Sequence, residues 1–130
     1  MTDTPSGVPD GYHTVTPYLI VPDADAVLTF IEKAFGGRTR ERHTDDDGLV
    51  MHAETTIGDS VIMVGQANDE WPPRRAMIHL YVDDADRVYR SALDAGATSV
   101  REPEDMHYGD RSGGVEDPWG NQWWMATRIG

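Results

Sequence analysis

The sequence predicts an α+β domain built from two tandem βαβββ modules. The first reason is an internal repeat, because residues 21–27 (VPDADAV) match residues 82–88 (VDDADRV) at an offset of 61. The second reason is that each copy holds one helical pattern, preceded by one apolar run and followed by three extended segments. Two copies are too few for a solenoid, so we expect them to pack together.

The length of the chain favours a single domain. Its 130 residues suffice for one hydrophobic core and are too few for two ordinary domains. We expect a flexible N-terminal tail over residues 1–12 and one domain over residues 13–130. Within that domain, module 1 spans about 13–66, a proline-containing connector spans 67–75, and module 2 spans about 76–128.

Module 1 begins with a strand and a helix. The apolar run 16–21 predicts the strand, and Asp23 takes the N-cap position, where a carboxylate accepts hydrogen bonds from free backbone amides. Gly36 and Gly37 end the helix, because glycine suits a left-handed C-cap. The apolar face of the helix repeats with the 3.6-residue period and consists of Val27, Phe30, Ile31, Ala34 and Phe35.

Module 2 repeats this plan. We expect its strand over 77–82 and its helix over 85–95, with Asp83 or Asp84 as the N-cap and Gly96 as the end. Three shorter strands follow each helix, separated by turn sequences such as DDDG, IGDS and DPWGN. These strands are expected at 38–43, 49–57, 60–66, 98–101, 112–116 and 121–128.

The charge balance restricts the partners. With 23 acidic and 11 basic residues, the net charge of −12 disfavours nucleic acid and anionic membranes and favours cationic ligands. Alternatively, the acidic surface reflects the source organism and has no role in ligand binding. Zero cysteines exclude disulfides and thiolate metal sites. No apolar run is long enough to span a bilayer and no secretory signal is visible, so we expect a cytoplasmic protein.

Three stretches carry a resemblance to a known family: PYLIVPDADAVLTFIEKAFGG, HLYVDDADRVYRSALDAGAT and DPWGNQW. Over about residues 13–128 the chain resembles the vicinal oxygen chelate superfamily, which comprises glyoxalases, bleomycin resistance proteins and extradiol dioxygenases. The resemblance implies the glyoxalase/bleomycin-resistance fold, in which a cupped mixed β-sheet surrounds a ligand cavity and the helices lie outside. It also implies a homodimer with cavities between the chains.

The same resemblance identifies the positions at which relatives bind a divalent metal. The early positions of the two modules are Thr16 and Met77, and the late positions are Ile62 or Met63 and Trp124. A divalent cation needs oxygen or imidazole ligands in a fixed geometry, which alkyl, thioether and indole groups do not supply. We therefore expect no metal and no cofactor, as in a metal-free glyoxalase-like branch of the superfamily.

Strand alternation indicates what lines the cup. If Met77 faces inward, so do His79 and Tyr81, whereas Trp123 and Trp124 point to opposite faces, Trp123 into the core and Trp124 into the cup. A loop before the seventh strand holds Tyr108, Asp110 and Arg111, which are candidates for the rim of the cup. Alternatively, Tyr108 and Arg111 only pin the loop. The candidate ligand-binding residues are Tyr18, His79, Tyr81, Tyr108, Arg111 and Trp124.

An aromatic cup in an acidic protein predicts that it binds or sequesters a small aromatic or cationic organic molecule, as drug-resistance members of the superfamily do. The alternative is an enzyme of the same superfamily, a lyase, isomerase or dioxygenase. It would use a relocated metal, for which His52 and Glu54 share a strand face, or His79 as acid and base. A third possibility is that the chain's own side chains fill the cup. The module would then bind no small molecule, and its role would be to associate with other protein chains. The sequence leaves open whether any reaction is catalysed.

Overall fold

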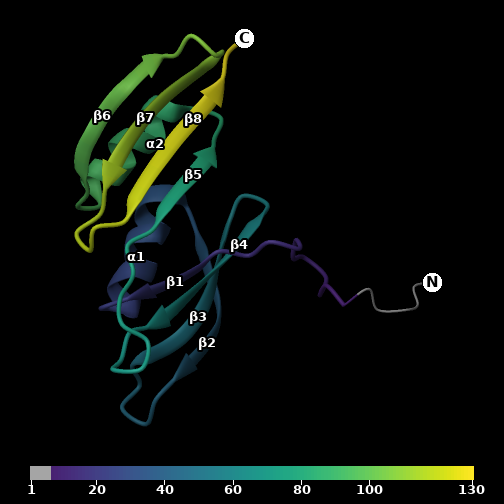
Figure 1. Ribbon diagram of the computed structural model, residues 1–130, viewed down its shortest axis with the longest axis vertical. Helices are drawn as coiled ribbons and strands as arrows, with labels where there is room; N and C mark the ends of the chain where they lie inside the picture. The colour runs from purple at the N-terminus through teal and green to yellow at the C-terminus, as the bar shows by residue number, and fades with distance from the viewer. Residues whose placement is uncertain (1–6) are drawn as a thin grey trace.

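The computed structural model describes residues 7–130 and consists of two four-stranded sheets and two helices (Figure 1). Module 1 contains β1 (Tyr18–Val21), α1 (Ala24–Phe35), β2 (Arg38–Thr44), β3 (Val50–Ile57) and β4 (Ser60–Gln66). Module 2 contains β5 (Met77–Tyr81), α2 (Ala85–Asp94), β6 (Thr98–Asp105), β7 (Asp110–Glu116) and β8 (Gln122–Arg128). The predicted βαβββ plan is confirmed in both copies. The first six residues of the expected tail lie outside the described residues.

Both sheets have the same mixed topology, with orders β1-β4-β3-β2 and β5-β8-β7-β6. The first strand of each module runs parallel to the last, pairing Tyr18 with Met63 and His79 with Trp124. This register places Met63, and not Ile62, at the late position of module 1, because Ile62 points into the hydrophobic core. In Figure 1 the two sheets succeed one another along the long axis of the molecule.

Some strand boundaries differ from those expected. The strand β1 begins at Tyr18 instead of Thr16, because Pro17 has no N–H to contribute to the sheet. The strands β6 and β7 are longer than predicted and pair as far as Asp105 with Arg111, so that the loop between them shrinks to residues 106–109. Asp110 and Arg111 are therefore strand residues and not loop residues.

The helix ends follow the predicted chemistry. Asp23 accepts a hydrogen bond from the backbone N–H of Ala26, and Asp84, rather than Asp83, accepts one from Arg87, each at 3.1 Å. Gly36 ends α1 with a left-handed φ of 69°. The helix α2 ends one residue earlier than expected, with Ala95 as its C-cap. No helix within residues 7–130 is long and apolar enough to cross a bilayer.

A single hydrophobic core joins the two modules. Each helix packs on its own sheet, and α1 also packs on α2. The side chain of Trp123, in β8, is 0% exposed, and its ring centroid lies 4.8 Å from that of Phe35 in α1. Phe30 of α1 contacts the same indole. The prediction that Trp123 belongs to the core is confirmed, and its indole holds module 2 against α1.

Candidate ligand-binding site

The DPWGN turn fixes the entry to β8 through one buried carboxylate. Oδ1 of Asp117 accepts hydrogen bonds from the backbone N–H groups of Trp119 and Asn121, at 3.0 and 2.9 Å. Oδ2 accepts hydrogen bonds from Nδ2 of Asn121 and Nε1 of Trp123, both at 3.0 Å. Four donors therefore converge on one aspartate, which sets the direction in which the two adjacent tryptophans point.

The indole of Trp124, on the face of the module 2 sheet away from the helices, is already covered by other residues of the chain. The indole lies over Gly114, where an added Cβ would come within 2.6 Å of Cε3 of Trp124. The guanidinium of Arg101 lies 4.9 Å from the indole centroid, and Nε1 of Trp124 donates to Oε1 of Gln122 at 3.1 Å. The cation–π interaction available at this indole is thus satisfied internally.

The four equivalent positions of the two modules do not fit a divalent metal. Thr16, Met63, Met77 and Trp124 offer one hydroxyl, two thioethers and an indole, none of which replaces carboxylate or imidazole ligands. Within residues 7–130 no group of three or more histidine, aspartate or glutamate side chains could hold a metal ion elsewhere. This donor chemistry argues against the metal-dependent reactions of the superfamily.

A buried carboxylate on the same face is paired with a tyrosine and an arginine. Asp110, which is 2% exposed, accepts a hydrogen bond from the hydroxyl of Tyr81 at 2.9 Å, and Nε of Arg128 lies 3.4 Å from its other oxygen. The hydrogen bond to Asp110, followed by the charge of this carboxylate, raises the pKa of Tyr81. Tyr81 therefore remains a neutral phenol at physiological pH.

The raised pKa of Tyr81 gives a testable pH dependence. Because its folded-state pKa lies above the unfolded value of about 10, the pair contributes stability below that pH, and the contribution is lost as the pH rises through the folded pKa. We expect spectrophotometric titration to show a late phase above a pH of about 10. Both Tyr81 and Tyr12 contribute to it, because a hydrogen bond to Glu54 raises the pKa of Tyr12 as well, so Tyr81→Phe should reduce the amplitude of this late phase. An unchanged late phase in the variant would contradict the assignment.

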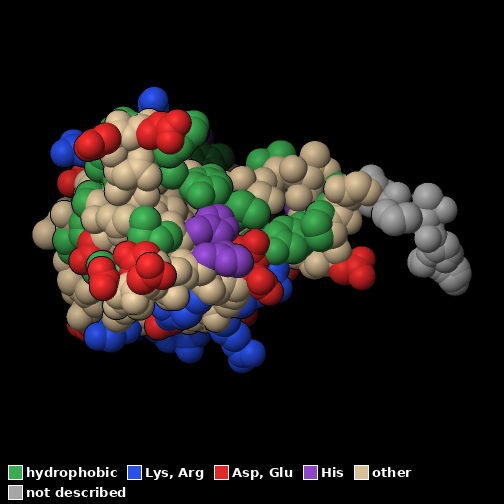
Figure 2. Space-filling view, turned by 90° about the horizontal axis from the view of Figure 1, so that it is seen from below, with side chains coloured by type: hydrophobic (Ala, Val, Ile, Leu, Met, Phe, Trp, Pro, Cys, Tyr) green, Lys and Arg blue, Asp and Glu red, His purple; other side chains and the backbone are tan. Residues whose placement is uncertain are grey.

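Module 1 has a comparable arrangement. Glu54 of β3 accepts a hydrogen bond from the hydroxyl of Tyr12, and Nε of Arg40 lies 3.3 Å from the same oxygen. Nearby, the hydroxyl of Tyr18 lies 3.0 Å from Nδ1 of His52. In Figure 2, which views this end of the molecule, histidine side chains lie among acidic and apolar ones, and basic side chains gather along one edge. The sequence did not predict the contact between Tyr12 and Glu54, because nothing in the composition of the expected tail distinguishes Tyr12 from its neighbours.

A large cavity with a volume of about 580 Å³ lies between the two modules. The β3–β4 turn, the end of β5, the end of α1 and the start of α2 form it. Its apolar wall consists of Phe35, Ile57, Ile62, Leu80, Val82 and Val88. Its polar groups are His79, Tyr81, Ser60, Asp59, Asp83, Asp84 and Arg87. Three aspartates and one arginine thus line the cavity together with an apolar wall.

A smaller cavity of about 220 Å³ adjoins the first. Ser60, Ile62, His79 and Leu80 line both cavities, and Thr16 is among the residues that line only the smaller one. His79 is therefore a residue shared by the two cavities, and its ring centroid lies 4.9 Å from that of Tyr81. Both aromatic rings come from the exposed face of β5.

The structure separates the predicted ligand-binding residues into two groups. His79 and Tyr81 line the large cavity, whereas Tyr18, Tyr108 and Trp124 line neither of the two adjoining cavities. Arg111 does not form a rim: its Nε and Nη2 bind the carboxylate of Asp86 in α2 at 2.9 and 3.2 Å. Of the two roles considered for Arg111, the structure favours the one that pins β7, here to α2.

The acidic residues of the cavity were not recognised as a site from the sequence. The sequence predicts Asp83 or Asp84 as an N-cap, a role that Asp84 has, and it places Asp59 in a turn. Only the fold brings Asp59 of module 1 to the same cavity as Asp83 and Asp84 of module 2. The excess of acidic residues was the sole sequence signal for this arrangement, and it does not identify which residues meet.

Comparison with known proteins identifies the family of the chain and relatives with the same fold. The family model described as "Glyoxalase/Bleomycin resistance protein/Dioxygenase superfamily" matches residues 12–125. An uncharacterized protein of Mycobacterium bovis is 36% identical over 129 residues, which cover 88% of this chain and 83% of the relative. An uncharacterized Mycobacterium tuberculosis protein is also 36% identical, over 88% of this chain and 74% of its own length.

Two solved structures illustrate the shared fold. TioX from Micromonospora sp. ML1 superimposes with a TM-score of 0.75 at 22% identity, covering 90% of this chain and 99% of TioX. A member of the same superfamily from Sphaerobacter thermophilus superimposes with a TM-score of 0.72 at 20% identity, covering 89% and 97% of the two chains. At these identities the similarity shows the fold alone.

Proposed function

The chain belongs to the Glyoxalase/Bleomycin resistance protein/Dioxygenase superfamily, and we propose that it binds and sequesters a small cationic organic molecule between its two modules. The observation that carries this proposal is the cavity of about 580 Å³ with an apolar wall and an acidic rim. Its size and its apolar wall are typical of small-molecule sites. A basic, drug-like compound has the chemistry that such a site retains.

Electrostatics favours a cation at this place. Asp59, Asp83 and Asp84 outnumber Arg87, and the chain carries a net charge of −12. A cavity lined by one sign of charge on low-dielectric walls concentrates ligands of the opposite sign. The side chain of Asp83 makes no hydrogen bond or ion pair within residues 7–130, so its carboxylate is free to accept an ammonium group.

The aromatic side chains complement the carboxylates. His79 and Tyr81 both line the cavity, their ring centroids lie 4.9 Å apart, and Tyr81 remains neutral because of its hydrogen bond to Asp110. A neutral phenol face attracts a cation by about 0.5–2 kcal/mol. Because the indole of Trp124 is already covered by Arg101, the proposal assigns the ligand to the cavity and not to that indole.

We expect benzylamine to raise the thermal stability of the protein and benzyl alcohol, its neutral counterpart, to do so far less. At about 100 times its Kd a ligand adds about 2.7 kcal/mol to the free energy of unfolding. In an Asp59→Asn/Asp83→Asn variant we expect about tenfold weaker binding, a loss of about 1.4 kcal/mol. Thermal unfolding measures the stabilisation, and isothermal titration calorimetry measures the affinities of the unmodified protein and the variant.

The matched control is Asp46→Asn/Asp69→Asn, which removes the same charge from exposed positions outside the cavity. We expect this control to bind benzylamine as the unmodified protein does. The proposal fails if neither the amine nor the alcohol binds, or if both double variants weaken binding equally. Equal affinity for the amine and the alcohol would also overturn it, because the acidic rim would then have no role.

We also propose that two copies of the chain associate in the cytoplasm. The side chains of Met77 and Tyr81, 68% and 65% exposed, lie on a sheet face that no helix covers, and exposed apolar groups of this kind favour association. The absence of cysteines suits a reducing compartment. Light scattering is expected to give twice the chain mass of 14.4 kDa, and a value for one chain would contradict the dimer.

A further inference from the structure

The duplicated chain forms a second cavity that is the counterpart of the first. This cavity has a volume of about 230 Å³ and lies where the β7–β8 turn meets the end of β1. At the offset of 61 that relates the modules, its residues Ile20, Val21 and Pro22 correspond to Tyr81, Val82 and Asp83 of the large cavity. Each turn that precedes the last strand of one module thus meets the first strand of the other.

The two counterparts differ in charge. The large cavity has three carboxylates, but none lines the second cavity, where Pro22 stands in the place of Asp83. The connector between the modules runs along this second cavity and contributes Pro73, Arg74 and Arg75. Its charge is therefore positive, in a chain with twice as many acidic as basic residues.

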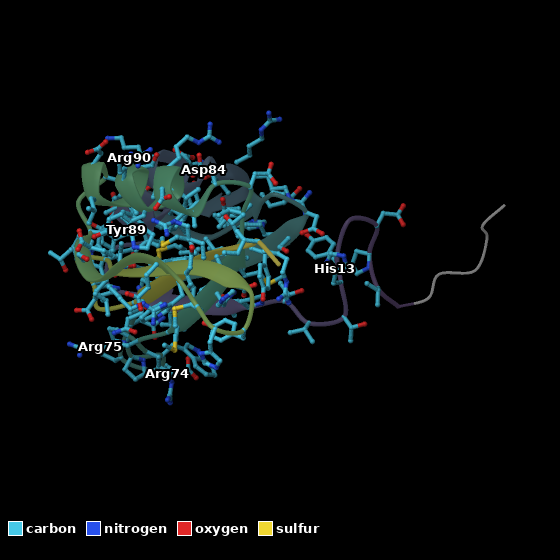
Figure 3. All side chains as sticks on the ribbon, turned by 90° about the horizontal axis from the view of Figure 1, so that it is seen from above. His13, Arg74, Arg75, Asp84, Tyr89 and Arg90 are labelled. Carbon is cyan, nitrogen blue, oxygen red and sulfur yellow. The ribbon has the colours of Figure 1, made fainter. Side chains whose placement is uncertain are left out.

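Both arginines lack an acidic partner. Within residues 7–130 neither Arg74 nor Arg75 forms an ion pair, although acidic residues are abundant. The backbone N–H of Arg74 donates to the carbonyl of Ile20 at 3.1 Å and holds the connector against β1. In Figure 3 the side chains of Arg74 and Arg75 project from the same edge of the molecule, opposite Arg90 and Asp84.

The second arginine occupies space that a glycine leaves open. A Cβ added at Gly120 would lie 2.7 Å from Nε of Arg75, so the DPWGN turn approaches the guanidinium closely only because this position is glycine. Trp119 of the same turn lines the cavity, and its indole N–H donates to no residue within 7–130. The side chain of Asn121, by contrast, already bonds Ala76 and Asp117.

We propose that this second cavity binds a small oxyanion carried on an apolar body, of which an aromatic carboxylate is the simplest example. The groups without partners are all donors, and the planar guanidinium matches a carboxylate or phosphate with two parallel hydrogen bonds. Ile20, Pro22, Pro73 and Trp119 supply the apolar wall. At about 30 Å³ per water, the volume equals that of about eight waters, which admits one small ring and excludes a nucleotide.

The test is titration with benzoate, inorganic phosphate and neutral benzamide, followed by calorimetry. We expect benzoate to bind, benzamide to bind at least about tenfold more weakly because it lacks the charge, and phosphate to bind more weakly than benzoate because it lacks the ring. Arg74→Gln/Arg75→Gln is expected to weaken benzoate binding about tenfold or more. Because both side chains are exposed, the unfolding midpoint of this variant should stay unchanged.

The control is Arg38→Gln/Arg90→Gln, which removes two exposed arginines that have no ion pair and do not line this cavity. It should bind benzoate normally. The inference is overturned if benzoate does not bind, if benzamide binds as well, if phosphate binds as tightly as benzoate, or if both arginine pairs give the same loss. Benzylamine binding in the Arg74→Gln/Arg75→Gln variant tests the large cavity separately, so the two proposals fail independently.

Discussion

Replacement of Trp123 with alanine is expected to lower the free energy of unfolding by about 3–5 kcal/mol. The indole is fully buried between β8 and α1, where it contacts Phe30 and Phe35 and donates its N–H to Asp117. The substitution leaves a cavity at the junction of the two modules and an acceptor without its partner. Urea unfolding followed by circular dichroism measures the loss.

Trp124→Ala is the matched control for this prediction. The neighbouring indole is only half-buried, lies across the sheet surface and donates to Gln122. We expect its removal to cost clearly less than the removal of Trp123, since more of its surface is already in contact with water. Equal losses for the two variants would contradict the assignment of Trp123 to the shared core.

Replacement of Asp117 with alanine is expected to lower the free energy of unfolding by at least about 3 kcal/mol. Its carboxylate accepts four hydrogen bonds, including those from the buried side chains of Asn121 and Trp123. Each buried donor left without an acceptor costs about 1–3 kcal/mol. The same urea titration measures this loss.

Asp117→Asn separates the hydrogen bonds from the shape of the side chain. The asparagine oxygen can still serve the backbone amides of Trp119 and Asn121, but its NH₂ group would face the two side-chain donors. We therefore expect an intermediate loss. An Asp117→Ala variant as stable as the unmodified protein would show that the turn does not depend on this carboxylate.

The fold was largely predictable because its determinants are local or repeated. The apolar periodicity of α1, the caps Asp23 and Gly36, and the offset between the modules are all readable in the chain. The alternation that separates Trp123 from Trp124 was equally local. The extension of β6 and β7 was not predictable, since it depends on register shifts after Ser99 and Arg101 that cross-strand pairing determines.

The candidate site was less predictable, because it depends on how the two modules meet. Alternation along β5 correctly grouped His79 with Tyr81, but it carries no information on which turn of module 1 lies beside them. The proximity of Arg101 to Trp124 likewise results from a glycine in β7 that lets the indole reach β6. Contacts of this kind arise from tertiary packing and leave no periodic pattern in the sequence.

The most direct test of the central claim is to map benzylamine binding by NMR chemical-shift perturbation of the backbone amides. Our account predicts that the perturbed residues cluster at 57–60 and 80–84, around the acidic cavity between the modules. Perturbations confined to the sheet face around Trp124, or none at saturating benzylamine, would contradict the assignment of this cavity as the ligand-binding site.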